Sequence, residues 1–376
     1  MRITKLDVAF VAAIVAMAGL ACKGGSKTDD AAKKSGGDTA EKAAEKADEK
    51  GEDGAGGKTD PKIDALAAKV LACDWKGEAF EYKCAKEPLE ALNTSELVKD
   101  GKAEETFLVY LTDQKPGKRW LGAEGLKNAG GKYRTETEPA KRVLAAVEAE
   151  KDAGVAKSLG AVMGLIDADK AGLVDEVLAQ AKGHPLEAMR AAYFSRTRFS
   201  NDKVYAAAFE AAKTDQSPTV RHAAFAAFWT GTPPGKKEDV CDLWLDRIKN
   251  DPTEREQAYA SYLLLFNINQ GCKQHYDETL TLIESRARSG KAQETQWGSS
   301  LGYLLKQKDL SPAHKARAIA VAKAIVENTA NEGFARKYAL EAIIEHDAAG
   351  MAYAEKFAND GNTFVKSAVA KAKEKK

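Results

Sequence analysis

The sequence lacks an excess of charge of either sign. It has 57 basic and 56 acidic side chains in 376 residues, a formal net charge of +1. Nucleic acids and acidic membrane surfaces attract proteins over long distances through a surplus of positive charge. Because this chain has no such surplus, we expect it not to bind nucleic acid.

A hydrophobic run long enough to span a membrane is also absent from the amino-terminal region. The apolar segment 8–21 has 14 residues, whereas a membrane-spanning helix needs roughly 20. It follows the basic residues Arg2 and Lys5, and small residues lead from it to Cys22. This order resembles a bacterial lipoprotein signal peptide, and a retained transmembrane anchor is the alternative.

The resemblance implies that residues 1–21 are removed and that Cys22 becomes the first residue of the mature chain. Its lipidated thiol, carrying fatty acids such as palmitate, would then anchor the protein to a membrane. Lys23 replaces the aspartate that holds such proteins at the inner membrane of enteric bacteria, which implies the outer membrane, facing the periplasm or the cell surface. Leu20 departs from the family pattern, since it stands two residues before the cysteine and not three.

Residues 22–60 form a segment rich in Lys, Glu, Asp, Gly and Ala. After the cysteine it has no aromatic and no branched aliphatic residue. Such a segment cannot bury enough apolar surface to offset the entropy lost on ordering. We expect a disordered tether, which as a flexible coil would span roughly 35 Å.

The remaining chain, residues 61–376, is rich in alanine and poor in alternating strand patterns. Its prolines are expected between helices, and the pairs Ser217-Pro218, Asp251-Pro252 and Ser311-Pro312 predict helix starts with the proline in the first position. Glu254 would complete a capping box after Asp251. The best strand candidate, residues 106–111, fits a buried helix better because helical patterns flank it. The sequence therefore predicts an all-α body.

Two segments of this body repeat. S-P-T-V-R-H-A-A-F from Ser217 and D-P-T-E-R-E-Q-A-Y from Asp251 share a cap, a proline, a threonine and an arginine, 34 residues apart. Weaker copies follow the same plan, and a longer gap through Gln296 leaves room for one more unit. The pattern is similar to that of HEAT repeats over most of residues 100–376, which implies an α-solenoid of helical hairpins. A bundle of unrelated hairpins is the alternative.

In HEAT repeats the basic residue lies on the second helix of each unit, near the inner side. The matching positions could form a ladder that binds a partner, or they could hydrogen-bond to loops of the next repeat. These positions are Arg119, Lys157, Arg190, Arg221, Arg255, Arg336 and Lys366.

Four cysteines remain after Cys22. Their even number suits an oxidising compartment, and their positions favour the disulfides Cys73–Cys84 and Cys241–Cys272. The second pair would join the two ends of an antiparallel hairpin. Metal binding is the alternative, because Cys272 and His275 have C-x-x-H spacing, but one Cys and one His do not complete a four-ligand site. We expect no metal and no cofactor.

One motif with catalytic spacing occurs. Residues 298–302 match G-x-S-x-G, but the nucleophile elbow of hydrolases needs a strand before the serine, and here the flanks read as one continuous helix. We expect close helix packing at these residues and a non-catalytic scaffold for a protein or an envelope polymer. The alternatives are an enzyme, either a Ser300 hydrolase or a protein similar to bilin lyases, and a self-assembling structural protein.

Aromatic residues are the other candidates for binding, because Trp and Tyr dominate interface hot spots. Most of those within the repeat helices must fill the core, and a few could face a partner. They are Tyr193, Phe194, Phe225, Phe228, Trp229, Tyr259, Tyr262, Phe266, Trp297 and Tyr303.

Overall fold

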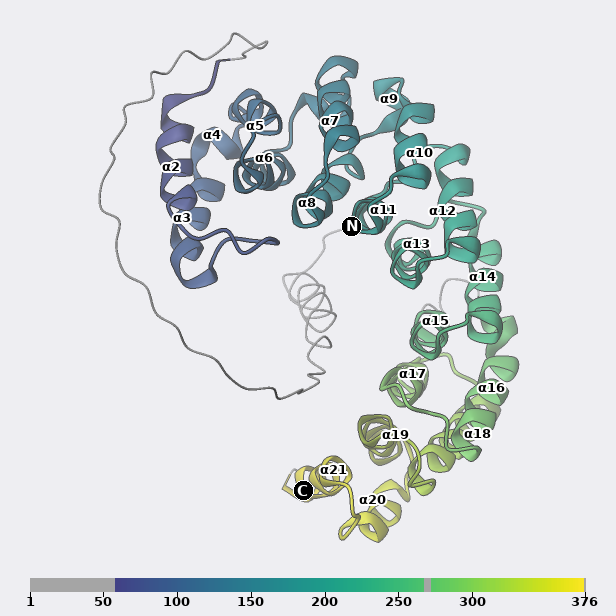
Figure 1. Cartoon of the computed structure of the whole chain (residues 1–376). Coiled ribbons are helices and arrows are strands. Elements are labelled where there is room, and N and C mark those ends of the chain that lie inside the picture. Colours follow the sequence, from purple (N-terminus) through teal and green to yellow (C-terminus); the bar gives the residue numbers. More distant parts are fainter. Residues whose placement is uncertain (1–57, 267–271, 375–376) are drawn as a thin grey trace, which may run out of the picture. The chain divides into compact units, whose positions relative to one another are not determined.

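The computed structural model describes residues 58–266 and 272–374 (Figure 1). Within these residues every regular element is an α-helix or a short 3₁₀-helix, and the only extended pairing is an isolated bridge between Trp75 and Phe80. The all-α prediction is thus confirmed. The predicted signal peptide, Cys22 and most of the predicted tether lie outside the described residues.

The amino-terminal part of the described chain has three helices, α2 (Pro61–Leu71), α3 (Tyr82–Thr94) and α4 (Glu96–Lys99). Asp60 caps α2 by accepting a hydrogen bond from the backbone N–H of Lys62 at 2.8 Å. We call residues 72–81, which join α2 to α3, the clasp loop. The disulfide Cys73–Cys84 closes this loop at its base.

The following helices come in successive pairs along the chain. Their bounds are α5 (Glu104–Tyr110) with α6 (Pro116–Ala129), α7 (Thr137–Ala149) with α8 (Ala153–Met163), α10 (Val174–Gly183) with α11 (Glu187–Arg196), α12 (Asp202–Thr214) with α13 (Pro218–Gly231), α14 (Lys237–Asn250) with α15 (Glu254–Phe266), α16 (Tyr276–Arg288) with α17 (Gln296–Leu305), α18 (Pro312–Glu327) with α19 (Gly333–His346), and α20 (Gly350–Ala354) with α21 (Thr363–Glu374). The two helices of each pair pack together except α16 and α17, which mainly contact other helices. Shorter elements are η1 (Lys132–Arg134), α9 (Ala168–Ala171), η3 (Lys273–His275) and η4 (Glu355–Phe357).

The pairs stack so that corresponding helices touch. The first row consists of α5, α7, α10, α12, α14, α16 and α18, and the second row of α6, α8, α11, α13, α15, α17, α19 and α21 (Figure 1). Within each row every helix contacts the next one. No pair has a core of its own, because the apolar residues lie between the rows and between neighbouring pairs. Trp244, for example, is 2% exposed on α14 and donates its indole N–H to the carbonyl of Phe225 on α13.

Helices begin as predicted at two of the three Ser-Pro and Asp-Pro sites. Ser217 caps α13 and Ser311 caps α18, each with its proline in the first turn. The prediction for Asp251-Pro252 was wrong: α15 begins at Glu254, and no capping box forms there. The reason is that the Asp251 carboxylate is turned toward Arg221 and Thr253. The prediction that prolines lie between helices was also wrong for Pro88, which lies inside α3.

Candidate functional site

The second row carries the predicted basic ladder, and four of its seven members reach the next pair. Arg119 on α6 donates hydrogen bonds from Nε and Nη2 to Glu150, at 2.8 and 2.9 Å. Glu150 directly follows α7 and lies three residues ahead of α8, the next helix of the second row. Arg119 Nη1 also donates to the carbonyls of Asp113 and Gln114, which fix the start of its own helix.

The same arrangement recurs along the row. Arg221 on α13 donates to both oxygens of Asp251, at 2.9 and 3.0 Å, ahead of α15. Arg336 on α19 donates to both oxygens of Asp360, at 3.1 and 2.6 Å, ahead of α21. Arg190 on α11 lies 3.3 Å from Asp215, ahead of α13. We call these four arginines and their carboxylates the Arg relay.

Charge and burial make the Arg relay a strong set of contacts. Arg221 and Asp251 are 4% and 2% exposed. Burial alone would raise the pKa of Asp251, but the hydrogen bonds from Arg221 and Thr253 outweigh it, so the pKa of Asp251 lies below its usual range. The same balance holds for Glu150 beside Arg119. At Asp360 the hydrogen bonds from Arg336 are the main cause of the lowered pKa.

The other three ladder members differ. Lys157 on α8, Arg255 on α15 and Lys366 on α21 are exposed. The seven ladder residues therefore fall into two groups. The guanidinium groups of the Arg relay hold neighbouring pairs together, which is the alternative role given for the ladder above. Only the three exposed residues are accessible to a partner.

Aromatic side chains meet on the part of the second row formed by α13, α15 and α17. We call this set the aromatic face, and it consists of Trp229, Tyr259, Tyr262, Phe266 and Tyr303. Ring centroids of neighbours lie between 5.0 and 5.8 Å apart. Tyr262 is buried at its centre, and the other four are partly exposed. The remaining aromatic candidates, such as Phe225, Phe228 and Trp297, are fully buried in the core.

A His–Glu pair borders the aromatic face. His222 on α13 lies 2.6 Å from the Glu256 carboxylate of α15, and its ring centroid is 4.3 Å from that of Tyr259. Glu256 is 3% exposed. Burial, with a smaller contribution from Glu256, raises the pKa of Tyr259 to about 12, so the Tyr259 hydroxyl stays protonated at neutral pH. It can donate or accept a hydrogen bond at the border of an apolar surface.

Ser300, the candidate nucleophile, is fully buried on α17, and its hydroxyl donates to the carbonyl of Trp297 at 3.3 Å. The predicted continuous helix is corrected, since α17 begins only at Gln296. Gly298 allows close packing of α17 against α19, because a Cβ at this position would come within 2.0 Å of the Ala335 carbonyl oxygen. Because Ser300 is 0% exposed, a substrate cannot reach its hydroxyl in this packing of the helices.

Both predicted disulfides are present. Cys241 and Cys272 join α14 to the segment after α15, with a Cα–Cα distance of 5.3 Å, and both are buried. His275 instead lies 2.7 Å from Asp242. Among residues 58–266 and 272–374, no cluster of three or more Cys, His, Asp or Glu is placed to hold a metal ion, and no helix there is long and apolar enough to cross a bilayer.

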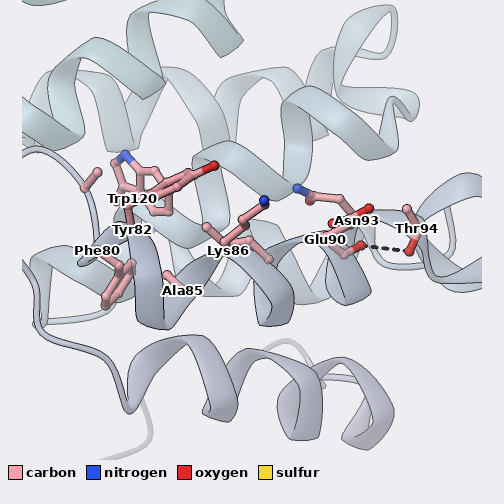
Figure 2. A pocket seen from close by; sticks show the side chains of 10 residues that line it. Phe80, Tyr82, Ala85, Lys86, Glu90, Asn93, Thr94 and Trp120 are labelled. Atoms are coloured by element: carbon pink, nitrogen blue, oxygen red, sulfur yellow. Dashed lines mark hydrogen bonds between the residues drawn. The ribbon is translucent and has the colours of Figure 1, made fainter.

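A groove that was not predicted from the sequence lies between α3, the clasp loop and α6 (Figure 2). Its volume is about 420 Å³, and Figure 2 shows Tyr82, Lys86 and Glu90 of α3 along it together with Trp120 of α6. Trp75 and Phe80 of the clasp loop pack against Trp120, with ring centroids 5.8 and 5.6 Å from it. The available signal was three aromatic residues, Trp75, Phe80 and Tyr82, between two paired cysteines.

Comparison with known proteins identifies no relative: no protein-family model matches the sequence, and no curated protein matches it.

Proposed function

We propose that this chain is a lipid-anchored protein of the bacterial cell envelope. In this proposal Cys22 carries the lipid, residues 22–60 act as a tether, and the helix pairs form an α-solenoid of HEAT-like repeats that serves as a non-catalytic protein-binding scaffold. The observation that carries the binding role is the aromatic face.

The aromatic face has the composition of an interaction surface. Trp and Tyr are enriched at interface hot spots because they bury a large rigid area and keep one polar atom for a hydrogen bond. Here three such rings, Trp229, Tyr259 and Tyr303, stay partly exposed although a packed core lies directly beneath them. Arg255 lies on α15 with Tyr259, Lys306 directly follows α17, which carries Tyr303, and both charged residues are exposed. An apolar centre with charged residues around it is the usual anatomy of a protein interface.

The repeat arrangement supports the same role. Since each Arg relay contact fixes one pair against the next, side chains on α13 and α15 keep a set spacing, and a preformed surface loses little entropy on binding. The burial of Ser300 supports a non-catalytic role over the Ser300 hydrolase alternative.

The binding role can be tested by photocrosslinking in intact cells. A photoreactive phenylalanine analogue is placed at Tyr259, at Tyr303, or at Lys141, an exposed control position on α7 of the first row. We expect one heavier adduct at both aromatic positions and none at position 141. Equal adducts at all three positions would contradict the proposal, and adducts containing only this chain would favour self-assembly instead.

The anchor needs a separate test. Cells fed radiolabelled palmitate should label the wild-type chain and carry it in the membrane fraction, and Cys22→Ser should abolish both. The control variant Cys73→Ser/Cys84→Ser removes two other cysteines and should keep the label. Membrane retention of an unlabelled Cys22→Ser chain would instead support a retained transmembrane anchor.

A further inference from the structure

The clasp loop reaches from α2 and α3 onto the second row (Figure 1). The Phe80 ring lies on Gly117 in the first turn of α6, where a Cβ would come within 2.8 Å of it. At the tip of the loop the Gly77 carbonyl oxygen lies on Gly154 in the first turn of α8, where a Cβ would come within 1.9 Å of it. Glycine permits this approach because it has no side chain. The first turns of α6 and α8 thus form a seat for the loop.

No hydrogen bond or ion pair ties the clasp loop to its seat within the part of the chain that the structure describes. The backbone bonds of the loop are internal: the Lys76 N–H donates to the Ala79 carbonyl and the Glu81 N–H to the Asp74 carbonyl, each at 2.9 Å. The contact with α6 and α8 therefore consists of ring packing and backbone apposition. Lifting the loop breaks these contacts and leaves no buried ion pair or hydrogen bond unsatisfied on the seat.

The seated loop acts as a cover. Trp120 of α6 is 9% exposed beneath Trp75 and Phe80, whereas the outer residues of the loop, Asp74 and 76–79, are exposed. Ala79 and Phe80 also form one wall of the groove between α3, the clasp loop and α6. Lifting the loop would uncover Trp120 and open this groove on one side.

The disulfide Cys73–Cys84 fastens the two ends of the cover, with a Cα–Cα distance of 5.8 Å. Cys73 is 6% exposed, but Cys84 is an exposed residue. A thiolate that attacks the Cys84 sulfur would form a mixed disulfide and release Cys73 as a thiol. A second thiol of the same reductant then frees Cys84 and closes the reductant's own disulfide. Two electrons and two protons thereby pass from a dithiol to the two cysteines.

From this geometry we propose that the clasp loop is a redox-controlled strap. With Cys73–Cys84 closed, the strap stays on its seat and covers Trp120; reduction by a dithiol protein, one that carries a pair of reactive cysteines, releases it. Without the bond the free loop gains conformational entropy, and only the ring and backbone contacts oppose its release. The strap does not depend on the lipid anchor or on the aromatic face.

Hydroxyl-radical footprinting of the full chain, read by mass spectrometry, tests the proposal because it reports the accessibility of single side chains. On reduction with dithiothreitol, oxidation of Trp120 should rise about fivefold as the ring goes from 9% exposed to roughly half exposed. Trp244, which is 2% exposed on α14, is the control and should stay at its low level. The variant Cys73→Ser/Cys84→Ser should show the same rise without reductant, while Cys241–Cys272 stays closed.

A second variant lifts the strap while its disulfide stays closed. Gly154→Ala places a methyl group where the Gly77 carbonyl lies and should raise Trp120 oxidation. The matched control is Gly302→Ala in α17, where a Cβ would meet only the Ala342 methyl group at 3.7 Å, and it should change nothing.

The proposal is overturned if Trp120 oxidation stays constant after alkylation shows that Cys73–Cys84 has opened, or if Gly154→Ala and Gly302→Ala behave alike. Loss of hydrogen-exchange protection throughout α2 to α4 on reduction would also overturn it, because the bond would then support the fold of the segment and not the seating of the loop.

Discussion

The segment from α2 to α4 and the helix pairs from α5 onward are held together by different kinds of contact. The clasp loop is fixed by one disulfide and by the packing of Trp75, Phe80 and Trp120. Polar links also join this segment to the first pair: Asp64 of α2 accepts a hydrogen bond from Tyr110 at 2.6 Å, and the Asp60 backbone N–H donates to Thr106 at 2.8 Å. Along the pairs, by contrast, an arginine on one second-row helix repeatedly binds a carboxylate that precedes the next.

The difference shows that the contacts in the two regions stabilise different extents of the structure. The disulfide stabilises the loop that it closes, and the aromatic cluster joins this loop to Trp120 of α6 alone. Losing them should therefore affect mainly this end of the described chain. In the α-solenoid proposed above, an ion pair between neighbours carries stability from one pair to the next, because the energy of such an array is largely a sum of repeat and interface terms. Three predictions test this contrast.

The largest effect is expected from Arg221→Ala. It would leave the Asp251 carboxylate, whose side chain is 0% exposed, without its bidentate partner and with Arg247, 3.6 Å away, as its remaining cation. Breaking a buried pair costs about 3 to 5 kcal/mol in free energy of unfolding, and because Arg247 stays we expect a loss at the lower end, about 3 kcal/mol. Arg255→Ala is the matched control, because Arg255 occupies the same repeat position 34 residues later but is exposed; it should cost about 0.5 kcal/mol or less. Urea denaturation measures both. Equal losses would show that burial of the pair does not decide its contribution.

Removal of the disulfides should come next. Each loop closure contributes roughly 3 kcal/mol in the chain-entropy model, but the two bonds differ in access. Cys84 is exposed, whereas Cys241 and Cys272 are 1% and 0% exposed. Mild reductant followed by alkylation and mass spectrometry should therefore open Cys73–Cys84 first, and proteolysis should then cut the clasp loop while the pairs stay intact. Simultaneous opening of both bonds would contradict the contrast.

The smallest effect on stability is expected from lowering the pH. The pKa values of Glu150, Asp251 and Asp360 are lowered in the folded chain, so their pairs stabilise it above the unfolded pKa of roughly 4. This stability is lost as the pH falls through that value toward the folded pKa. The stability difference between wild type and Arg221→Ala should shrink below pH 4, as followed by thermal unfolding at stepped pH. A constant difference from pH 7 to pH 3 would contradict the assignment.

Much of the fold could be predicted from the sequence because the signals are local. Ser217 and Ser311 mark helix starts through their own side chains, and an apolar stripe on each helix needs no knowledge of its partner. The disulfide Cys241–Cys272 followed from the hairpin that joins its two helices.

The repeated motif alone does not predict which ladder residues bind a carboxylate and which stay exposed. Arg221 and Arg255 share it, yet only Arg221 finds an acidic partner ahead of the next second-row helix. The relay carboxylates lie 24 to 31 residues after their arginines, a spacing that was the missing signal. Between α15 and α17 a different link replaces the relay, since Glu254 accepts the indole N–H of Trp297 at 3.0 Å.

Native-state hydrogen exchange of wild type and Arg221→Ala is the most direct test of the claim that neighbouring pairs stabilise one another. The account predicts that protection falls in α13 and α15, falls less in α11 and α17, and stays unchanged in α2 to α4. Loss confined to α13, or an equal loss across every helix including α2 to α4, would contradict it.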